Sequence, residues 1–222
     1  MLSFSQLNSQ IVVPGSDYLL AKLRLNESKD GIKFTPYNDI IGDPYIFKDF
    51  SSGNVVFKSG ETYVADLRYD IYADLIQIKH NGNVFGISNT GSLSKIIIDT
   101  LTFLYDNIII RPGAKKPSAE KYCFILKEEG KCLLLIHKNL RIQDVEPPKL
   151  YQDAKPAKFI HLKDSFYLKT ENSNAIKVKN LKDIISVLSD KREELRQFIR
   201  LNNLRIKDLS DLDKIVSYYN SL

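Results

Sequence analysis

The clearest pattern of hydrophobic and polar positions lies in residues 62–87. From 63 to 75 the odd positions are apolar or aromatic, and most of the even positions are charged. This alternation predicts an antiparallel strand with one buried face, and it assigns the aspartates at 66, 70 and 74 to the solvated face. The pattern changes phase at Leu75-Ile76, so we predict a tight turn at residues 72–74.

A second hairpin is predicted directly after the first one. The turn sequence is His80-Asn81-Gly82-Asn83. Asn-Gly supplies the two positive-φ residues that a type I′ turn requires, so residues 84–87 should fold back on the preceding strand.

Further short apolar runs alternate with turns rich in Gly and Asn. This spacing indicates an antiparallel sheet, a sandwich or a rolled sheet. The further strands are predicted at residues 32–37, 45–49, 54–58, 100–110, 122–127, 132–137, 159–162, 166–169 and 176–179. The segment 139–156, with two adjacent prolines, is predicted to be a long extended loop, and loops of this length often bind partners.

After residue 180 the hydrophobic period changes to that of a helix. Asn180 can cap a first helix together with Asp183, and further helices are predicted to begin at Asp190 and at Asp208 or Ser210. Each has a narrow apolar stripe, so we expect these helices to pack on the sheet with one face.

These patterns predict a mainly β fold of the α+β type, an antiparallel β-meander, rolled sheet or sandwich with a C-terminal cap of about three helices. The 222 residues allow one or two domains. Residues 111–117 contain two prolines and mark a connector. We divide the chain into an N-terminal β subdomain at 10–110, a second β subdomain at 111–180 and the helical cap at 181–222.

The balance of hydrophobic and charged residues, 43% against 27%, is typical of a globular protein rather than a disordered one. No apolar run approaches the roughly 20 residues of a membrane-spanning helix. Residues 1–110 carry a net charge of −3, and residues 111–222 carry +8. A basic half can bind nucleic acid, an acidic polymer or anionic headgroups, but Lys-rich β surfaces also resist aggregation, which we consider the better explanation.

Lysines and aromatic residues interleave in the basic half, as they do in surfaces that bind nucleic acid by stacking and phosphate contacts. The chain has few arginines, however, and an acidic partner protein or glycan fits this composition equally well. The candidate partner-binding residues are Lys115, Lys116, Lys149, Tyr151, Lys155 and Lys158.

Catalytic chemistry has little support in the sequence. The histidines are His80, His137 and His161, each in a different predicted element. Alternate side chains along a strand are about 7 Å apart, so the aspartates at 66, 70 and 74 are too far from one another to hold one calcium ion. We assign no catalytic residue, metal or cofactor, and an enzyme is the least supported class.

The two cysteines, Cys123 and Cys132, flank a predicted turn at Glu129-Gly130. Their offset along this hairpin exceeds the Cα separation of a disulfide, so we expect two buried free thiols.

Two interpretations of residues 1–9 remain open. The segment lacks the basic start and the apolar core of a complete signal peptide, but it is similar to the end of one, with Ser9 at the cleavage position. Alternatively, it is a frayed N-terminus.

Three segments carry a resemblance: residues 69–79 (YDIYADLIQIK), 130–135 (GKCLLL) and 211–222 (DLDKIVSYYNSL). With them the chain resembles a group of uncharacterised exported β-rich proteins of Bacteroidota, which combine a YD hairpin, a G-K-x-x-L-L hairpin and a helical YYNSL tail. These motifs are structural, so the resemblance implies no activity. It implies a periplasmic or outer-membrane-facing location and supports the signal-peptide interpretation of residues 1–9.

From these observations we expect a non-enzymatic exported module, periplasmic or extracellular and outer-membrane associated, that binds an envelope protein or an acidic surface polymer. The alternative is a cytoplasmic nucleic-acid-binding domain that uses the basic second half. A third class is a hydrolase with a site assembled from loops.

Overall fold

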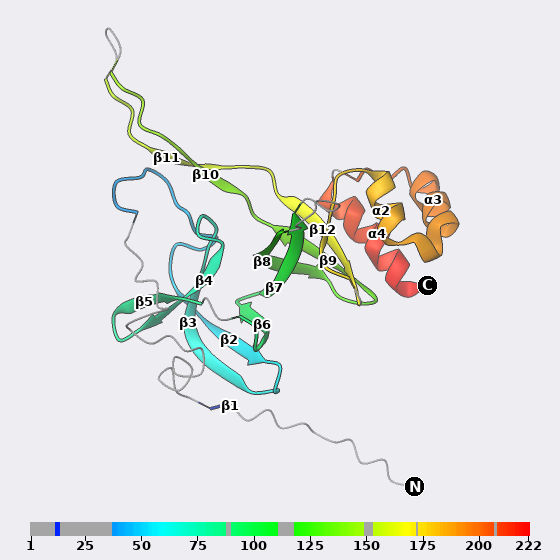
Figure 1. The fold of residues 1–222 in the computed structure, drawn as a ribbon, viewed down its shortest axis with the longest axis horizontal. Helices are drawn as coiled ribbons and strands as arrows, with labels where there is room; N and C mark the ends of the chain where they lie inside the picture. Colours follow the sequence, from blue (N-terminus) through cyan, green and yellow to red (C-terminus); the bar gives the residue numbers. More distant parts are fainter. Residues whose placement is uncertain are drawn as a thin grey trace.

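The computed structural model describes residues 12–13, 37–87, 90–110, 118–148, 153–171, 173–206 and 208–222. It is mainly β, as predicted, with an antiparallel sheet of ten strands, a small two-stranded sheet and three α-helices near the C-terminus (Figure 1). The strand order of the large sheet is β13-β12-β9-β8-β7-β6-β2-β3-β4-β5. Most neighbours in the sheet are therefore also neighbours in the chain, as in a meander.

The large sheet contains β2 (Ser51–Phe57), β3 (Thr62–Asp70), β4 (Leu75–His80), β5 (Asn83–Gly86), β6 (Leu93–Ile98), β7 (Leu101–Ile110), β8 (Ser118–Glu128), β9 (Cys132–His137), β12 (Ser165–Thr170) and β13 (Ile176–Val178). A short β1 (Val12–Val13) pairs with β3 in parallel. The small sheet contains β10 (Leu140–Gln143) and β11 (Lys158–His161). The helices are α2 (Leu181–Val187), η1 (Ser189–Lys191, a 3-10 turn), α3 (Arg192–Leu201) and α4 (Leu209–Ser221).

Both predicted hairpins in residues 62–87 are confirmed. β3 and β4 pair from Asp66–Lys79 to Asp70–Leu75, and the turn ends at Asp74 with a φ of 51°. β4 and β5 are joined by Asn81 and Gly82, whose φ angles of 47° and 78° are the positive values of a type I′ turn.

The strands on both sides of residues 111–117 belong to one sheet. β7 pairs with β8 from Thr102–Leu126 to Ile110–Ser118, the longest pairing in the sheet. One core lies on the β2–β4 and β6–β8 strands, with Tyr69 and Phe103 among its large buried side chains.

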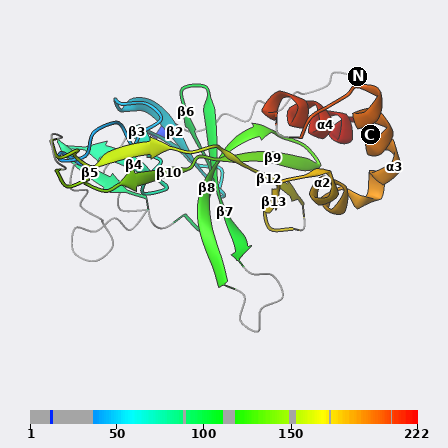
Figure 2. The same ribbon diagram turned by 90° about the horizontal axis from the view of Figure 1, so that it is seen from above.

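A second core joins the helices to the strands near one end of the sheet. Leu134 and Leu168 of the strands are fully buried against Ile184, Leu212 and Ile215 of the helices. Each such side chain contributes about 1.5–3 kcal/mol by leaving water. Figures 1 and 2 show the three helices gathered at the β9–β12–β13 end, where they form the predicted cap.

Two predictions about local structure are wrong, and one strand was not predicted. Residues 46–49 form bends instead of a strand. The Arg68 guanidinium lies 3.5 Å from the Tyr45 ring centre and donates a hydrogen bond to the Lys48 carbonyl oxygen in this segment. β6 was not predicted, since its run LSKIII lacks clean alternation. The predicted loop at 139–156 begins with β10, which pairs with β11. The strand predicted at 32–37 lies outside the described residues except for Tyr37.

The prediction of a solvated face for all three aspartates is wrong at Asp70, which is fully buried. Its Oδ2 accepts hydrogen bonds from Tyr37 Oη at 3.0 Å and from Gln77 Nε2 at 2.9 Å, and its Oδ1 accepts one from the Ala73 amide. These donors replace the water that the carboxylate loses, so Asp70 organises the β3–β4 turn from inside.

Candidate functional site

The structure describes two of the six residues predicted to bind a partner. Lys155 lies on the segment that joins β10 to β11, with its Nζ 3.0 Å from Glu146 Oε2. Lys158 is exposed in β11, opposite Gln143. The remaining four candidates lie outside the described residues: Lys115, Lys116, Lys149 and Tyr151. The structure therefore places Lys155 and Lys158 on the same part of the chain, which consists of β10, β11 and the described residues between them and which we call the β10–β11 arm. The other four positions of the predicted surface stay a prediction.

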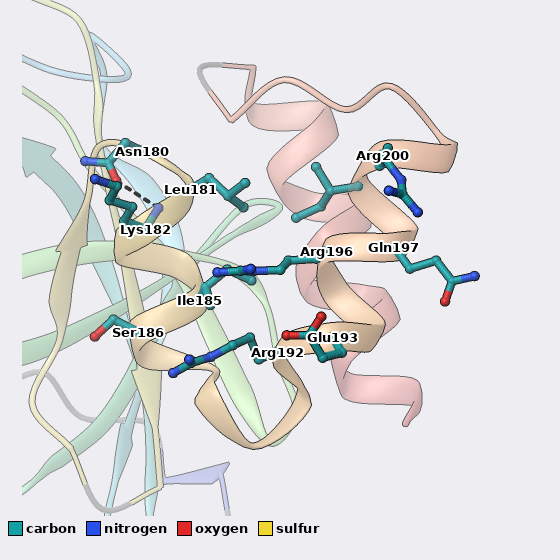
Figure 3. Close-up of a pocket in the computed structure, with 11 residues that line it drawn as sticks. Asn180, Leu181, Lys182, Ile185, Ser186, Arg192, Glu193, Arg196, Gln197 and Arg200 are labelled. Atoms are coloured by element: carbon teal, nitrogen blue, oxygen red, sulfur yellow. Dashed lines mark hydrogen bonds between the residues drawn. The ribbon is translucent and has the colours of Figure 1, made fainter.

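A different basic site lies in the C-terminal cap. Helices α2 and α3 enclose a groove of about 1210 Å³, which we call the α2–α3 groove (Figure 3). It is lined by Asn180, Leu181, Lys182, Ile185, Ser186, Arg192, Glu193, Arg196, Gln197, Ile199 and Arg200. The lining thus combines four basic side chains with one carboxylate and an apolar portion.

The α2 wall starts from a capping box that the sequence predicted. Asn180 Oδ1 accepts hydrogen bonds from the amides of Lys182 and Asp183, at 2.9 and 3.2 Å. Asp183 Oδ2 accepts the Asn180 amide in return, at 3.2 Å. This reciprocal cap satisfies backbone donors at the start of the helix and fixes its first turn. Leu181 and Ile185, one turn apart, then face the groove.

The α3 wall is held by its apolar face. Leu195 is fully buried and Ile199 is 8% exposed. Phe198 stacks on Tyr218 of α4, with ring centres 4.0 Å apart and an interplanar angle of 7°. Because these contacts fix the rotation of α3, its other positions must face the groove or the solvent.

Three arginines follow α3 at intervals of four residues: Arg192, Arg196 and Arg200. A four-residue step places successive side chains on the same helical face, about 6 Å apart along the axis. In Figure 3, Arg192 and Arg196 extend from α3 toward α2, whereas Gln197 points away. Within the described part of the chain, none of the three arginines forms an ion pair, although several lysines do.

Polar side chains of α4 connect this helix to η1 and to the sheet beside the groove. Tyr219 Oη donates to the carboxylate of Asp190 in η1, at 3.1 and 3.2 Å from its two oxygens. Burial and this acceptor raise the pKa of Tyr219, so the phenol remains a donor. Lys127 of β8 pairs with Asp213 at 3.2 Å. These contacts anchor α4 to η1 and to the sheet, and α4 in turn supports α3.

The histidines and cysteines form no comparable site. Among the described residues, no group of three His, Cys, Asp or Glu side chains converges as metal ligands. His137 stacks on Tyr122 and places its Nε2 3.4 Å from Asp74, which also accepts the Tyr69 hydroxyl. Both cysteines are free and buried, as predicted. Burial raises the pKa of the Cys132 thiol to about 12, so it is a poor nucleophile.

The described helices also give one result about membranes: none of them has the length and apolar character needed to span a bilayer.

The chemistry of the α2–α3 groove follows from its guanidinium groups. Arginine presents planar donors that bind carboxylates and phosphates through paired hydrogen bonds. The spacing of four residues between arginines is visible in the sequence, but the low arginine content of the whole chain favoured the lysines as the predicted basic surface.

Comparisons of this chain with protein-family models, with curated proteins and with solved structures find no match.

Proposed function

We propose that the protein is a non-enzymatic binding module whose helical cap holds an acidic macromolecule in the α2–α3 groove. The observation that carries this proposal is the row of arginines on α3 that lack an intramolecular carboxylate partner in the described part of the chain. The lining has four basic side chains and one acidic one, so an anionic occupant is favoured.

The magnitudes favour a polymer over a single small anion. An exposed ion pair contributes about 0.2–1 kcal/mol, so one carboxylate in the groove would bind only weakly. A ligand that contacts all three arginines gains about 0.6–3 kcal/mol from charge alone, and paired hydrogen bonds add to this. The groove therefore fits a partner that carries several negative charges along one chain.

Binding of fluorescein-labelled poly-L-glutamate, measured by anisotropy at low and moderate salt, tests the proposal. The variant Arg192→Gln/Arg196→Gln/Arg200→Gln should lose most of the affinity, since Gln retains helix propensity but removes the charge. The matched control is Lys155→Gln/Lys158→Gln, which removes charge from the arm instead.

The expected result is weak binding by the arginine variant and unchanged binding by the lysine variant. If the lysine variant loses binding and the arginine variant keeps it, the partner surface is the arm and the groove proposal fails. Absence of any binding at low salt by the unchanged protein would also overturn it.

We further propose that the protein is exported. The resemblance to exported Bacteroidota proteins in residues 69–79, 130–135 and 211–222 supports this location. Fractionation of cells that produce the protein from its own gene, followed by immunoblotting of each fraction, tests it. Recovery from the periplasm or the cell surface is expected, and recovery from the cytosol alone would contradict it.

A further inference from the structure

The geometry of the α2–α3 groove points to a specific class of occupant. We propose that it binds an extended peptide segment in which carboxylates occupy alternate positions and apolar side chains lie between them. This inference rests on the proposed function, because it requires that the groove binds an acidic partner at all.

The first argument is the spacing on the α3 wall. Successive arginines among Arg192, Arg196 and Arg200 are separated by four residues, or about 6 Å along the helix. In an extended chain, residues i and i+2 point to the same side and lie about 6.6–6.8 Å apart. Three alternate carboxylates would span about 13 Å and three arginines about 12 Å, a difference that the long arginine side chains can absorb.

The second argument comes from the opposite wall. Leu181 and Ile185 of α2 are also four residues apart and line the groove, where Leu181 is partly exposed and Ile185 is 5% exposed. Figure 3 shows α2 and α3 facing each other, with Ile185 level with Arg196. An extended segment between two such walls turns its odd positions toward one wall and its even positions toward the other. Alternation of acidic and apolar residues therefore matches both walls together.

The third argument separates a peptide from a nucleic acid. Proteins that bind single-stranded nucleic acid stack the bases on aromatic side chains. None of the residues that line the groove is aromatic. A uniformly charged polymer would also leave the exposed apolar surface of Leu181 without a matching partner. The lining thus favours an acidic peptide with apolar residues.

Two fluorescent peptides of equal composition test the inference directly. One contains Asp-Leu-Asp-Leu-Asp and the other Asp-Asp-Asp-Leu-Leu, each between short Gly-Ser flanks. We expect the alternating peptide to bind about five- to tenfold tighter, because only it contacts both walls. Arg196→Gln should weaken both peptides, whereas Leu181→Ser should weaken the alternating one more. Circular dichroism of each variant verifies that the helices remain folded.

The outcomes separate this inference from the proposed function. If both peptides bind equally and Arg196→Gln weakens both, the groove binds acidic chains and the alternation inference is wrong. If neither peptide nor poly-L-glutamate binds, both proposals fail. A third outcome is that an oligothymidylate of ten nucleotides binds more tightly than the alternating peptide and that Arg196→Gln abolishes this binding. That result would assign the groove to nucleic acid instead.

Discussion

The side chain of Asn220 forms two hydrogen bonds with the backbone of Cys132. Its Oδ1 accepts from the Cys132 amide at 2.8 Å, and its Nδ2 donates to the Cys132 carbonyl oxygen at 3.0 Å. A Cβ atom at Gly130 would lie 2.5 Å from the Asn220 Cγ and Nδ2 atoms. The GKCLLL hairpin and the YYNSL tail therefore meet at one docking point, where α4 is fixed to the start of β9.

Replacement of Asn220 by Ala should lower the free energy of unfolding by about 1–3 kcal/mol. The reason is that it removes the hydrogen-bond partners of the partly buried Cys132 amide and carbonyl groups. Urea denaturation followed by circular dichroism measures this loss. The control is Asn107→Ala, an exposed asparagine in β7 that should change stability by less than about 0.5 kcal/mol. Equal effects of the two substitutions would show that the Asn220 contacts are not important for stability.

The close approach of Gly130 and Asn220 predicts a non-additive pair. Gly130→Ala should destabilise the unchanged protein, since the new methyl group collides with the amide of Asn220. The same substitution should cost much less when Asn220 is already Ala. A double-mutant cycle of unfolding free energies measures this coupling, and strict additivity would contradict the predicted contact.

Features that depend on adjacent residues could be predicted from the sequence. The Asn81-Gly82 turn and the Asn180–Asp183 capping box follow from local backbone chemistry, and the structure has both. Features that depend on distant partners could not. The alternation of residues in β3 places Asp70 on the solvated face. In the structure, however, Tyr37 and Gln77 donate hydrogen bonds to its carboxylate and cover it from solvent.

The candidate site was hidden for a related reason. Half of the arginines of the chain lie within residues 192–205, so their clustering was available in the sequence. The second wall was not, because Leu181 and Ile185 reach the groove only after η1 turns the chain back between α2 and α3. The groove is formed by two helices together, whereas the hydrophobic period of the sequence describes the faces of only one helix. The period therefore could not predict the groove.

The buried Asp70 predicts a pH dependence of stability. Burial raises the pKa of this carboxyl above its usual value of 3.8. As the pH rises past 3.8, the unfolded chain releases this proton before the folded protein does. The stabilising contribution of Asp70 is therefore full below pH 3.8, and it is lost as the pH rises through the raised pKa of the folded protein. Relative to Asp70→Asn, the unchanged protein should therefore lose stability between acidic and neutral pH.

Urea denaturation of both proteins across that pH range measures the effect, at about 1.4 kcal/mol for each unit by which the pKa is raised. The difference between the two proteins isolates Asp70 from the other carboxyl groups. A difference that stays constant with pH, or that grows in favour of the unchanged protein, would contradict the raised pKa.

The two thiols should be inert in the folded protein. Cys123 and Cys132 are buried, and burial raises the pKa of both, so little thiolate forms at pH 8. Ellman's reagent should react slowly with the native protein and rapidly with both thiols in guanidinium chloride. Fast labelling without denaturant would show an exposed thiol, and no labelling in denaturant would show a disulfide.

The single carboxylate in the groove lining should oppose an acidic ligand. Glu193→Gln is therefore expected to tighten binding of poly-L-glutamate about two- to fivefold. The matched control is Glu194→Gln, which removes the same charge from the neighbouring residue outside the lining, where it lies 3.9 Å from Lys191. Anisotropy titrations compare the two, and a larger gain from the Glu194 substitution would place the ligand elsewhere.

The most direct test of the central claim is to locate an acidic ligand on the folded protein. A titration of the isotope-labelled protein with hexaglutamate, followed by amide chemical shifts in two-dimensional NMR, identifies the residues it contacts. The binding account predicts that the largest shifts fall in α2 and α3, at residues 180–186 and 192–200, and that they shrink as salt is added. Shifts confined to the β10–β11 arm around residues 153–161, or no shifts at low salt, would contradict it.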